Sequence, residues 1–221
     1  MPDALPAALA VSALLAGALA GCGGDDDDDG GSDSAALPAG CTEVEAPPAK
    51  TVEAEPPGQP LKGPASAVVA TSCGEFTIEL ATAASPKTAA SFASLAEQGV
   101  YDDTPIHRVA RDFVIQGGDP AGDGTGGPGY SVDEPPPDDT VYSAGTVAMA
   151  KSGAEPPGRS GSQFFVVTAP ADAGLPPDYA VLGEVTAGFE VVEAIESLGD
   201  PSGADGPPTE PVVVETVRID G

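Results

Sequence analysis

The sequence predicts a mainly β fold for residues 67–221, a closed antiparallel β-barrel capped at its ends by two α-helices. Three observations favour this fold. Phe76, Ile78 and Leu80 alternate with polar residues, which is the period of a half-buried strand. Several further short apolar runs are separated by turns rich in glycine and proline. Only two segments have a helical period, and many short strands with few helices are typical of a barrel.

The first helix is predicted to begin after Ser85 and to end at Gly99. Ser85 is the expected cap, and Pro86 is tolerated in the first turn because the N–H that it lacks would have no partner there. A second helix is predicted over 189–198. The residues expected on the inner faces of the two helices are Ala89, Phe92, Leu95 and Ala96 in the first and Val191, Val192 and Ile195 in the second.

The remaining apolar runs are predicted to be short strands. The first two strands form a hairpin that turns at 72–74, and a last strand closes the domain. The predicted strands lie within 67–81 and over 105–109, 111–118, 145–150, 162–169, 179–185 and 211–219.

The N-terminal segment, residues 1–21, is predicted to be a signal peptide. Its apolar run from Leu5 to Ala20 has 16 residues, which is short for a membrane span of about 20 residues but suits a secretory signal. The segment before this run has no Lys or Arg, so the natural start could lie upstream. "LAGC", residues 19–22, resembles the lipobox of bacterial lipoproteins, in which the cysteine becomes the lipidated first residue. We therefore expect lipid on Cys22 and an anchor on the extracytoplasmic side of the cell membrane.

Residues 22–66 are predicted to be a disordered linker. They begin with an acidic run and continue rich in Pro, Ala and Glu, with no helical or strand period. The domain that follows, 67–221, has 24 acidic and 6 basic residues, a net charge of −18 with histidine neutral. This charge argues against nucleic acid or an anionic membrane surface as a partner.

The three cysteines predict a disulfide and no metal site. With Cys22 lipidated, Cys41 and Cys73 remain as an even pair that an oxidising compartment allows to join. Two free thiols are the alternative. Two cysteines and one histidine give no zinc-ligand spacing, and no cofactor is expected.

The glycine-rich loop does not predict a nucleotide site, although Gly124, Gly126 and Gly129 match the pattern G-x-G-x-x-G. That pattern holds phosphate only where the loop opens a helix. Here the loop continues into the proline-rich and acidic stretch 128–139, which can neither begin a helix nor attract a phosphate.

Six segments of the domain, taken together, indicate a family. They are, in order, "GEFTIEL", "SPKTAASFASLAEQGVYDDTPIHRV", "FVIQGGDPAGDGTGG", "GTVAMAK", "GSQFFV" and "YAVLGEV". In this order they resemble the cyclophilin family of peptidyl-prolyl cis-trans isomerases over essentially all of 67–221. The resemblance implies a cyclophilin-like barrel, isomerase activity without a cofactor, and a glycine loop that lies beside a peptide groove.

The resemblance also assigns roles to particular residues. It makes Arg108 the catalytic arginine, Gln116 the glutamine that positions it and touches the substrate backbone, and Phe113 the floor of the proline pocket. Further residues are implied to bind the substrate: Val114 and Phe165 in that pocket, Gly124, Ala150, Lys151 and Gln163 along the groove, and Leu175 and Tyr179 near it. Three positions depart from the family pattern, since Lys151 replaces a common asparagine, Leu175 lies near a common tryptophan, and Tyr179 replaces a common histidine. His107 is interpreted as a structural histidine rather than a catalytic base.

The leading hypothesis is a monomeric, lipid-anchored isomerase that assists the folding of exported proteins. Its partners would be proline-containing peptides and unfolded exported proteins. One alternative is a binding or chaperone module that keeps the groove but has little catalysis. A solute-binding lipoprotein would share the lipobox, but it needs two lobes and a longer chain.

Overall fold

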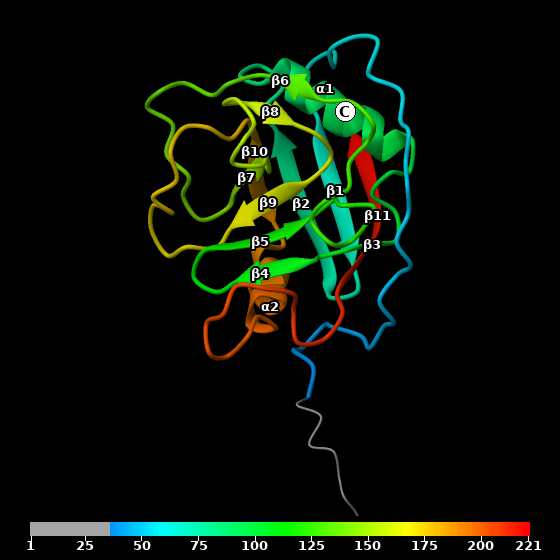
Figure 1. Ribbon diagram of the computed structural model, residues 1–221, viewed down its shortest axis with the longest axis vertical. Coiled ribbons are helices and arrows are strands. Elements are labelled where there is room, and N and C mark those ends of the chain that lie inside the picture. The colour runs from blue at the N-terminus through cyan, green and yellow to red at the C-terminus, as the bar shows by residue number, and fades with distance from the viewer. Residues whose placement is uncertain (1–35) are drawn as a thin grey trace, which may run out of the picture. The chain divides into compact units, whose positions relative to one another are not determined.

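The computed structural model describes residues 36–221, and this part of the chain is mainly β (Figure 1). The mainly β fold with two helices that the sequence predicts is therefore confirmed. The helices are α1 (Pro86–Glu97) and α2 (Phe189–Ser197). The strands are β1 (Ser66–Thr71), β2 (Gly74–Leu80), β3 (Thr104–Pro105), β4 (Arg108–Ala110), β5 (Val114–Gly117), β6 (Val132–Asp133), β7 (Thr146–Met149), β8 (Arg159–Ser160), β9 (Phe164–Val167), β10 (Val181–Ala187) and β11 (Val213–Asp220).

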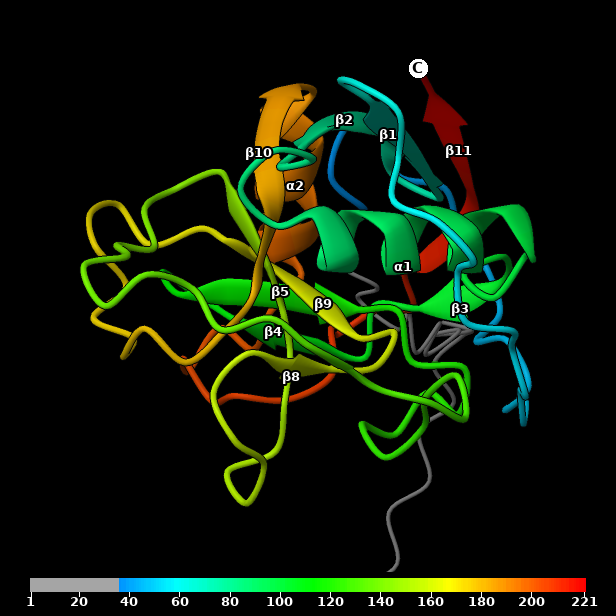
Figure 2. The same cartoon turned by 90° about the horizontal axis from the view of Figure 1, so that it is seen from above.

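Nine strands form one antiparallel sheet, in the order β3-β11-β1-β2-β10-β7-β9-β5-β4, and β6 pairs with β8 apart from it. The sheet curls, so that β1, β2 and β11 lie across from β4, β5 and β9 when the molecule is seen from above (Figure 2). The edge strands β3 and β4 do not pair with each other. The prediction of a closed barrel is therefore wrong, and the sheet is a half-barrel.

The gap has a simple cause, which is that both edge strands belong to one extended stretch of chain. Thr104–Pro105 pairs with β11, and the N–H of Ile106 donates to the carbonyl of Val212 at 2.9 Å. From His107 onward the same stretch pairs with β5, beginning with its N–H on the carbonyl of Gln116 at 3.1 Å. The stretch thus pairs first with β11 and then with β5. Because β3 and β4 follow each other along this stretch, they do not lie side by side and no ladder of hydrogen bonds joins them.

Helix α1 packs its predicted apolar face against the sheet. Ala89, Phe92, Leu95 and Ala96 are all buried there. The ring of Phe92 stacks on Tyr101 with centroids 4.7 Å apart and meets Phe164 edge-on at 5.7 Å. Such aromatic contacts fix the helix on the inner side of the sheet. In α2, Val192 and Ile195 are buried as expected, and Val191 is partly buried.

Ser85 occupies the N-cap position of α1 as predicted, but its side chain makes no capping hydrogen bond. Glu134 supplies the cap from the loop after β6. Its carboxylate accepts from the backbone N–H groups of Lys87 at 3.2 Å and Thr88 at 2.7 Å. A negative charge at the first turn also suits the helix dipole. Pro86 begins the helix as predicted.

Two hydrophobic clusters lie on opposite faces of β5 and β9. Ile115 and Val166 belong to the main core, which also holds the inner faces of the helices. Val114 and Phe165 belong to a second, smaller cluster on the other face. Because side chains alternate along a strand, these strands are buried on both faces. The second cluster forms the floor of the candidate site.

Residues 36–65, here called the strap, differ from the predicted linker. They form no helix or strand, but they run along the domain and contact it. The backbone N–H of Lys50 donates to the carbonyl of Pro120, and that of Ala54 donates to Pro128, both at 2.8 Å. Leu37, Val52 and Leu61 pack against the main core. The strap has no period because its backbone hydrogen bonds go to loops of the domain rather than to a ladder.

Cys41 and Cys73 are joined in a disulfide, with an S–S distance of 2.04 Å. This is the pairing that the cysteine count favours. It links the strap to the turn between β1 and β2, where Cys73 is buried and the N–H of Thr42 donates to the carbonyl of Ser72 at 2.8 Å.

The predicted signal peptide (1–21), the lipidation site Cys22 and the linker residues up to Ala35 lie outside the described residues. Within 36–221, neither helix is long and apolar enough to cross a membrane.

Candidate active site

The register of the sheet aligns the central residues of the site in one row. Arg108 on β4 lies opposite Gln116 on β5, which lies opposite Phe165 on β9, which lies opposite Ala148 on β7. Residues directly opposite in antiparallel strands share a face of the sheet. The row therefore presents a guanidinium, an amide and an aromatic ring side by side on the face away from the main core.

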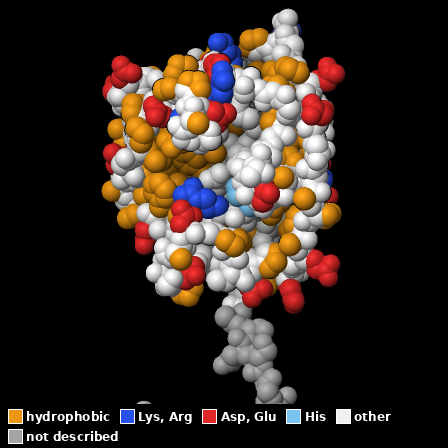
Figure 3. All heavy atoms as spheres, viewed as in Figure 1, with side chains coloured by type: hydrophobic (Ala, Val, Ile, Leu, Met, Phe, Trp, Pro, Cys, Tyr) orange, Lys and Arg blue, Asp and Glu red, His pale blue; other side chains and the backbone are white. Residues whose placement is uncertain are grey.

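A small cavity of about 140 Å³ lies over this row. Sites for drug-sized ligands occupy roughly 300–1,000 Å³, so this cavity is smaller than such a site and is the size of a side chain. Apolar side chains gather here on the face seen in Figure 3, with basic side chains beside them. All of its lining residues are among those predicted from the sequence: Arg108, Phe113, Val114, Gln116, Ala150, Lys151, Phe165, Leu175 and Tyr179.

The guanidinium of Arg108 is held from three sides. Its Nη1 donates to Oε1 of Gln116 at 2.9 Å, and its Cζ lies 5.9 Å from the centroid of the Phe113 ring. Its Nε and Nη2 donate to the two carboxylate oxygens of Asp205, each at 2.7 Å. These hydrogen bonds lower the pKa of the Asp205 carboxyl, which is therefore ionised at neutral pH.

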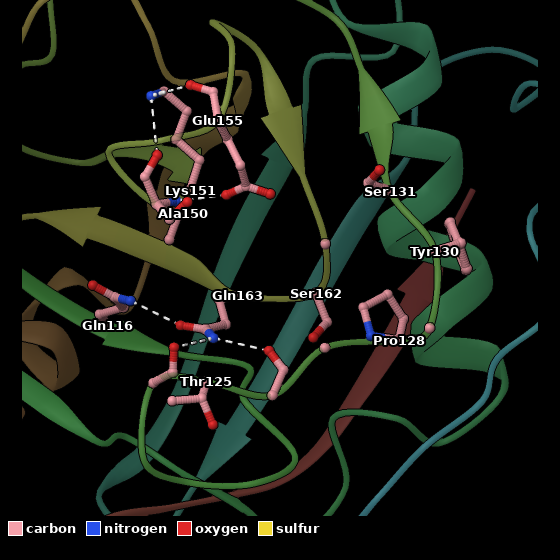
Figure 4. A pocket seen from close by; sticks show the side chains of 16 residues that line it. Gln116, Thr125, Pro128, Tyr130, Ser131, Ala150, Lys151, Glu155, Ser162 and Gln163 are labelled. Atoms are coloured by element: carbon pink, nitrogen blue, oxygen red, sulfur yellow. Dashed lines mark hydrogen bonds between the residues drawn. The ribbon is translucent and has the colours of Figure 1, made fainter.

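A chain of hydrogen bonds connects Gln116 to the glycine loop. Its Nε2 donates to Oε1 of Gln163 at 3.0 Å, and Nε2 of Gln163 donates to the carbonyls of Gly124 at 3.0 Å and Gly126 at 2.9 Å. Figure 4 shows this chain of contacts across the wall of a second, larger cavity of about 690 Å³. The two cavities share Gln116, Ala150 and Lys151, so together they form one groove.

Asp119, which the sequence reasoning missed, organises the glycine loop. It is fully buried, and its carboxylate accepts from the backbone N–H groups of Ala121 at 2.9 Å, Asp123 at 3.1 Å and Gly124 at 2.6 Å. A Cβ at Gly126 would collide with this carboxylate, and Gly124 has a φ of +86° that suits glycine. These amide donors therefore bind an internal carboxylate rather than a phosphate. An aspartate directly before Pro120 in a glycine-rich stretch was the available signal.

Tyr179 and Lys151 close the other end of the small cavity. Tyr179 meets Phe165 edge-on with ring centroids 5.4 Å apart, and its backbone N–H and carbonyl both bond to the hydroxyl of Tyr142, at 3.1 and 2.7 Å. The Nζ of Lys151 lies 5.5 Å from the Tyr179 ring centroid and donates to the carbonyl of Glu155 at 3.1 Å. The lysine charge is thus turned toward its own loop.

His107 lines a different cavity, of about 220 Å³, together with Ile106 and Gly122. Burial is the main cause of the lowered pKa of its imidazole, opposed by the nearby charge of Asp119. His107 lines neither of the two cavities that form the groove, and its structural role stays a prediction. Among residues 36–221, no three His, Cys, Asp or Glu side chains are grouped so that they could hold a metal ion.

The sequence matches one protein family over nearly the whole domain. The family model for cyclophilin type peptidyl-prolyl cis-trans isomerase matches residues 67–219. The chain belongs to the cyclophilin family. A probable peptidyl-prolyl cis-trans isomerase B of Mycobacterium leprae is 42% identical over 172 residues, which cover 70% of this chain and 57% of that protein. The peptidyl-prolyl cis-trans isomerase B of Streptomyces anulatus is 39% identical, with 70% of this chain and 95% of that protein covered.

The solved structures extend the cyclophilin likeness to the fold. A cyclophilin type peptidyl-prolyl cis-trans isomerase of Cryptosporidium parvum superimposes with a TM-score of 0.63 and 29% identity, over 72% of this chain and 99% of that one. The same protein was also crystallised in the presence of the dipeptide Ala-Pro. The chain spans only 57% and 54% of the lengths of the mycobacterial isomerases that it matches.

Proposed function

We propose that the chain is a peptidyl-prolyl cis-trans isomerase and that Arg108 is its catalytic residue. The observation that carries the proposal is the fixed guanidinium of Arg108 beside an apolar socket. Phe113, Val114, Phe165 and Leu175 form that socket. Membership of the cyclophilin family supports the reaction, and the Cryptosporidium relative crystallised with Ala-Pro supports a proline peptide as ligand.

The residues suit the chemistry of turning an X-Pro bond. The planar amide resists rotation by about 18–20 kcal/mol because resonance gives its C–N bond partial double-bond character. As the bond twists, the proline nitrogen becomes pyramidal and gains a lone pair. A guanidinium aimed at this nitrogen stabilises the twisted form and not the planar one, which is what catalysis requires. The socket holds the proline ring while the preceding residue turns.

The hydrogen bonding of Arg108 leaves donors for this task. Gln116 accepts one N–H of Nη1, and Asp205 accepts one N–H of Nη2 together with that of Nε. The other N–H of each terminal nitrogen remains for the substrate. In our proposal the larger cavity, lined by Gly124 and Gln163, takes the residues that precede the proline.

The test is a coupled cis/trans assay on short X-Pro peptides with wild type and Arg108→Ala. A lost charge-assisted hydrogen bond in the transition state should lower kcat/KM by roughly ten- to a hundredfold and leave the peptide Kd nearly unchanged. Arg108→Lys should restore little, because a point ammonium cannot bond the Asp205 fork and Gln116 together. Phe113→Ala should weaken peptide binding as well, because it empties the socket.

The matched control for Arg108→Ala is Arg159→Ala. Arg159 makes the same fork with Asp133, with both distances 2.7 Å, and neither residue lines the groove. This variant should keep wild-type turnover. If folded Arg108→Ala is as active as wild type, Arg108 is not catalytic. If the wild type binds X-Pro peptides without turnover, the chain is a binding module.

In our proposal the isomerase works as a monomer on exported proteins, held by lipid on Cys22 at the extracytoplasmic side of a membrane. The disulfide supports an oxidising compartment, where such bonds persist. In the producing bacterium, Cys22→Ser should move the protein from the membrane fraction to the soluble fraction. Wild-type protein that is already soluble and keeps Met1 would contradict the anchor.

A further inference from the structure

The pairing of Arg108 with Asp205 joins residues that are 97 positions apart in the sequence. It is a fork-to-fork contact, in which two parallel N–H groups meet two carboxylate oxygens. This geometry fixes both the position and the plane of a guanidinium, and a single hydrogen bond to Gln116 would not fix that plane. The side chains remain partly open to solvent, with 31% of Arg108 and 53% of Asp205 exposed.

Asp205 is itself held by the backbone of the loop that carries it. This loop, residues 198–209, is closed by the N–H of Thr209 on the carbonyl of Leu198 at 2.7 Å. The next residue, Gly206, accepts from the N–H of Val109 on β4 at 2.7 Å and forms an isolated β-bridge with it. The loop therefore docks on the strand of Arg108 through its backbone, independently of the Asp205 carboxylate.

We propose that Asp205 is a positioning residue for the isomerase reaction, which acts by holding the Arg108 guanidinium in its productive orientation. The inference rests on the catalytic role proposed for Arg108. A free arginine side chain samples many rotamers, and ordering it during the reaction would cost entropy. Asp205 and Gln116 order it beforehand, so that its remaining N–H groups already face the site where the proline nitrogen becomes pyramidal.

The test compares Asp205→Ala and the near-isosteric Asp205→Asn with wild type in the full chain, using the X-Pro peptide assay. Each variant should lower kcat/KM about fivefold. This is the change in rate that corresponds to the upper limit of the energy of an exposed ion pair. The peptide Kd from an NMR titration should change little, because the orientation matters chiefly in the twisted state. Asp133→Ala, which breaks the matching fork to Arg159, should leave both quantities unchanged.

A double-mutant cycle separates positioning from a merely structural role. In the Arg108→Ala background, Asp205→Ala should lower kcat/KM no further, because nothing remains for it to position. An equal loss in both backgrounds would overturn the inference and make Asp205 a support of the loop. A kcat/KM equal to or above that of wild type in both Asp205 variants would also overturn the inference. An increase would indicate that the Asp205 carboxylate competes with substrate for Arg108. These results leave the proposed function standing as long as Arg108→Ala alone is impaired.

Discussion

Removing the disulfide between Cys41 and Cys73 should destabilise the domain by an amount that the structure allows us to work out. The two residues are 32 positions apart, so the bond closes a loop of about 33 residues. The chain-entropy treatment gives about 3.7 kcal/mol for a loop of this length. For a domain of this size each kcal/mol shifts Tm by about 2–4 °C, so we expect a fall of about 7–15 °C.

The perturbation is the double substitution Cys41→Ala with Cys73→Ala, since alanine leaves no unpaired hydroxyl at the buried Cys73 position. The Tm of the variant should equal the Tm of wild type measured in the presence of reductant. Hydrogen exchange should also speed up at the amides of Lys50 and Ala54, whose bonds to Pro120 and Pro128 hold the strap. If wild type and variant melt at the same temperature, or if oxidised protein titrates with two free thiols, the strap does not depend on this bond.

Two further predictions concern the pH response and a helix cap. Burial lowers the pKa of His107 from its usual 6.5, so the unfolded chain binds a proton that the folded chain does not. The free energy of unfolding should therefore fall as the pH drops below 6.5. Replacing the imidazole, in His107→Asn, should make Tm less dependent on pH between pH 7 and 5. A wild-type profile no steeper than that of the variant would contradict the burial of a neutral ring. Glu134→Ala should cost about 1 kcal/mol because it leaves the N–H groups of Lys87 and Thr88 without their acceptor. In urea unfolding, the exposed Asp138→Ala serves as its control and should cost almost nothing.

The parts of the fold that the sequence could predict are those with a local period. The alternation through β2 and the apolar face of α1 both lie where the pattern indicates, because burial on one side repeats every two or every 3.6 residues. β6 and β8, with two residues each, are too short to show a period. The open edge between β3 and β4 could not be predicted, because the strand pattern does not tell which edges meet.

The candidate site shows the same division. Arg108, Phe113 and Gln116 lie within a few residues of one another in a family motif, and the structure brings them to one cavity. Asp205 comes from a loop far along the chain, in a glycine- and proline-rich stretch that resembles any surface turn. Two residues that contact each other over a long sequence separation have no characteristic spacing in the sequence, so only the folded structure reveals the contact.

The packing of the strap sets how far a lipid anchor would let the domain reach. From Ala36 onward the chain runs along the domain, and the disulfide at Cys41 ties it there. Cys22 and Ala36 are 14 positions apart, with the 13 residues 23–35 between them. Fully extended, such a length spans at most about 50 Å, close to the thickness of one bilayer with its headgroups. A lipid on Cys22 would therefore hold Ala36, where the strap begins, within that distance of the membrane, and inserting residues between Cys22 and Ala36 would increase this distance without altering the groove.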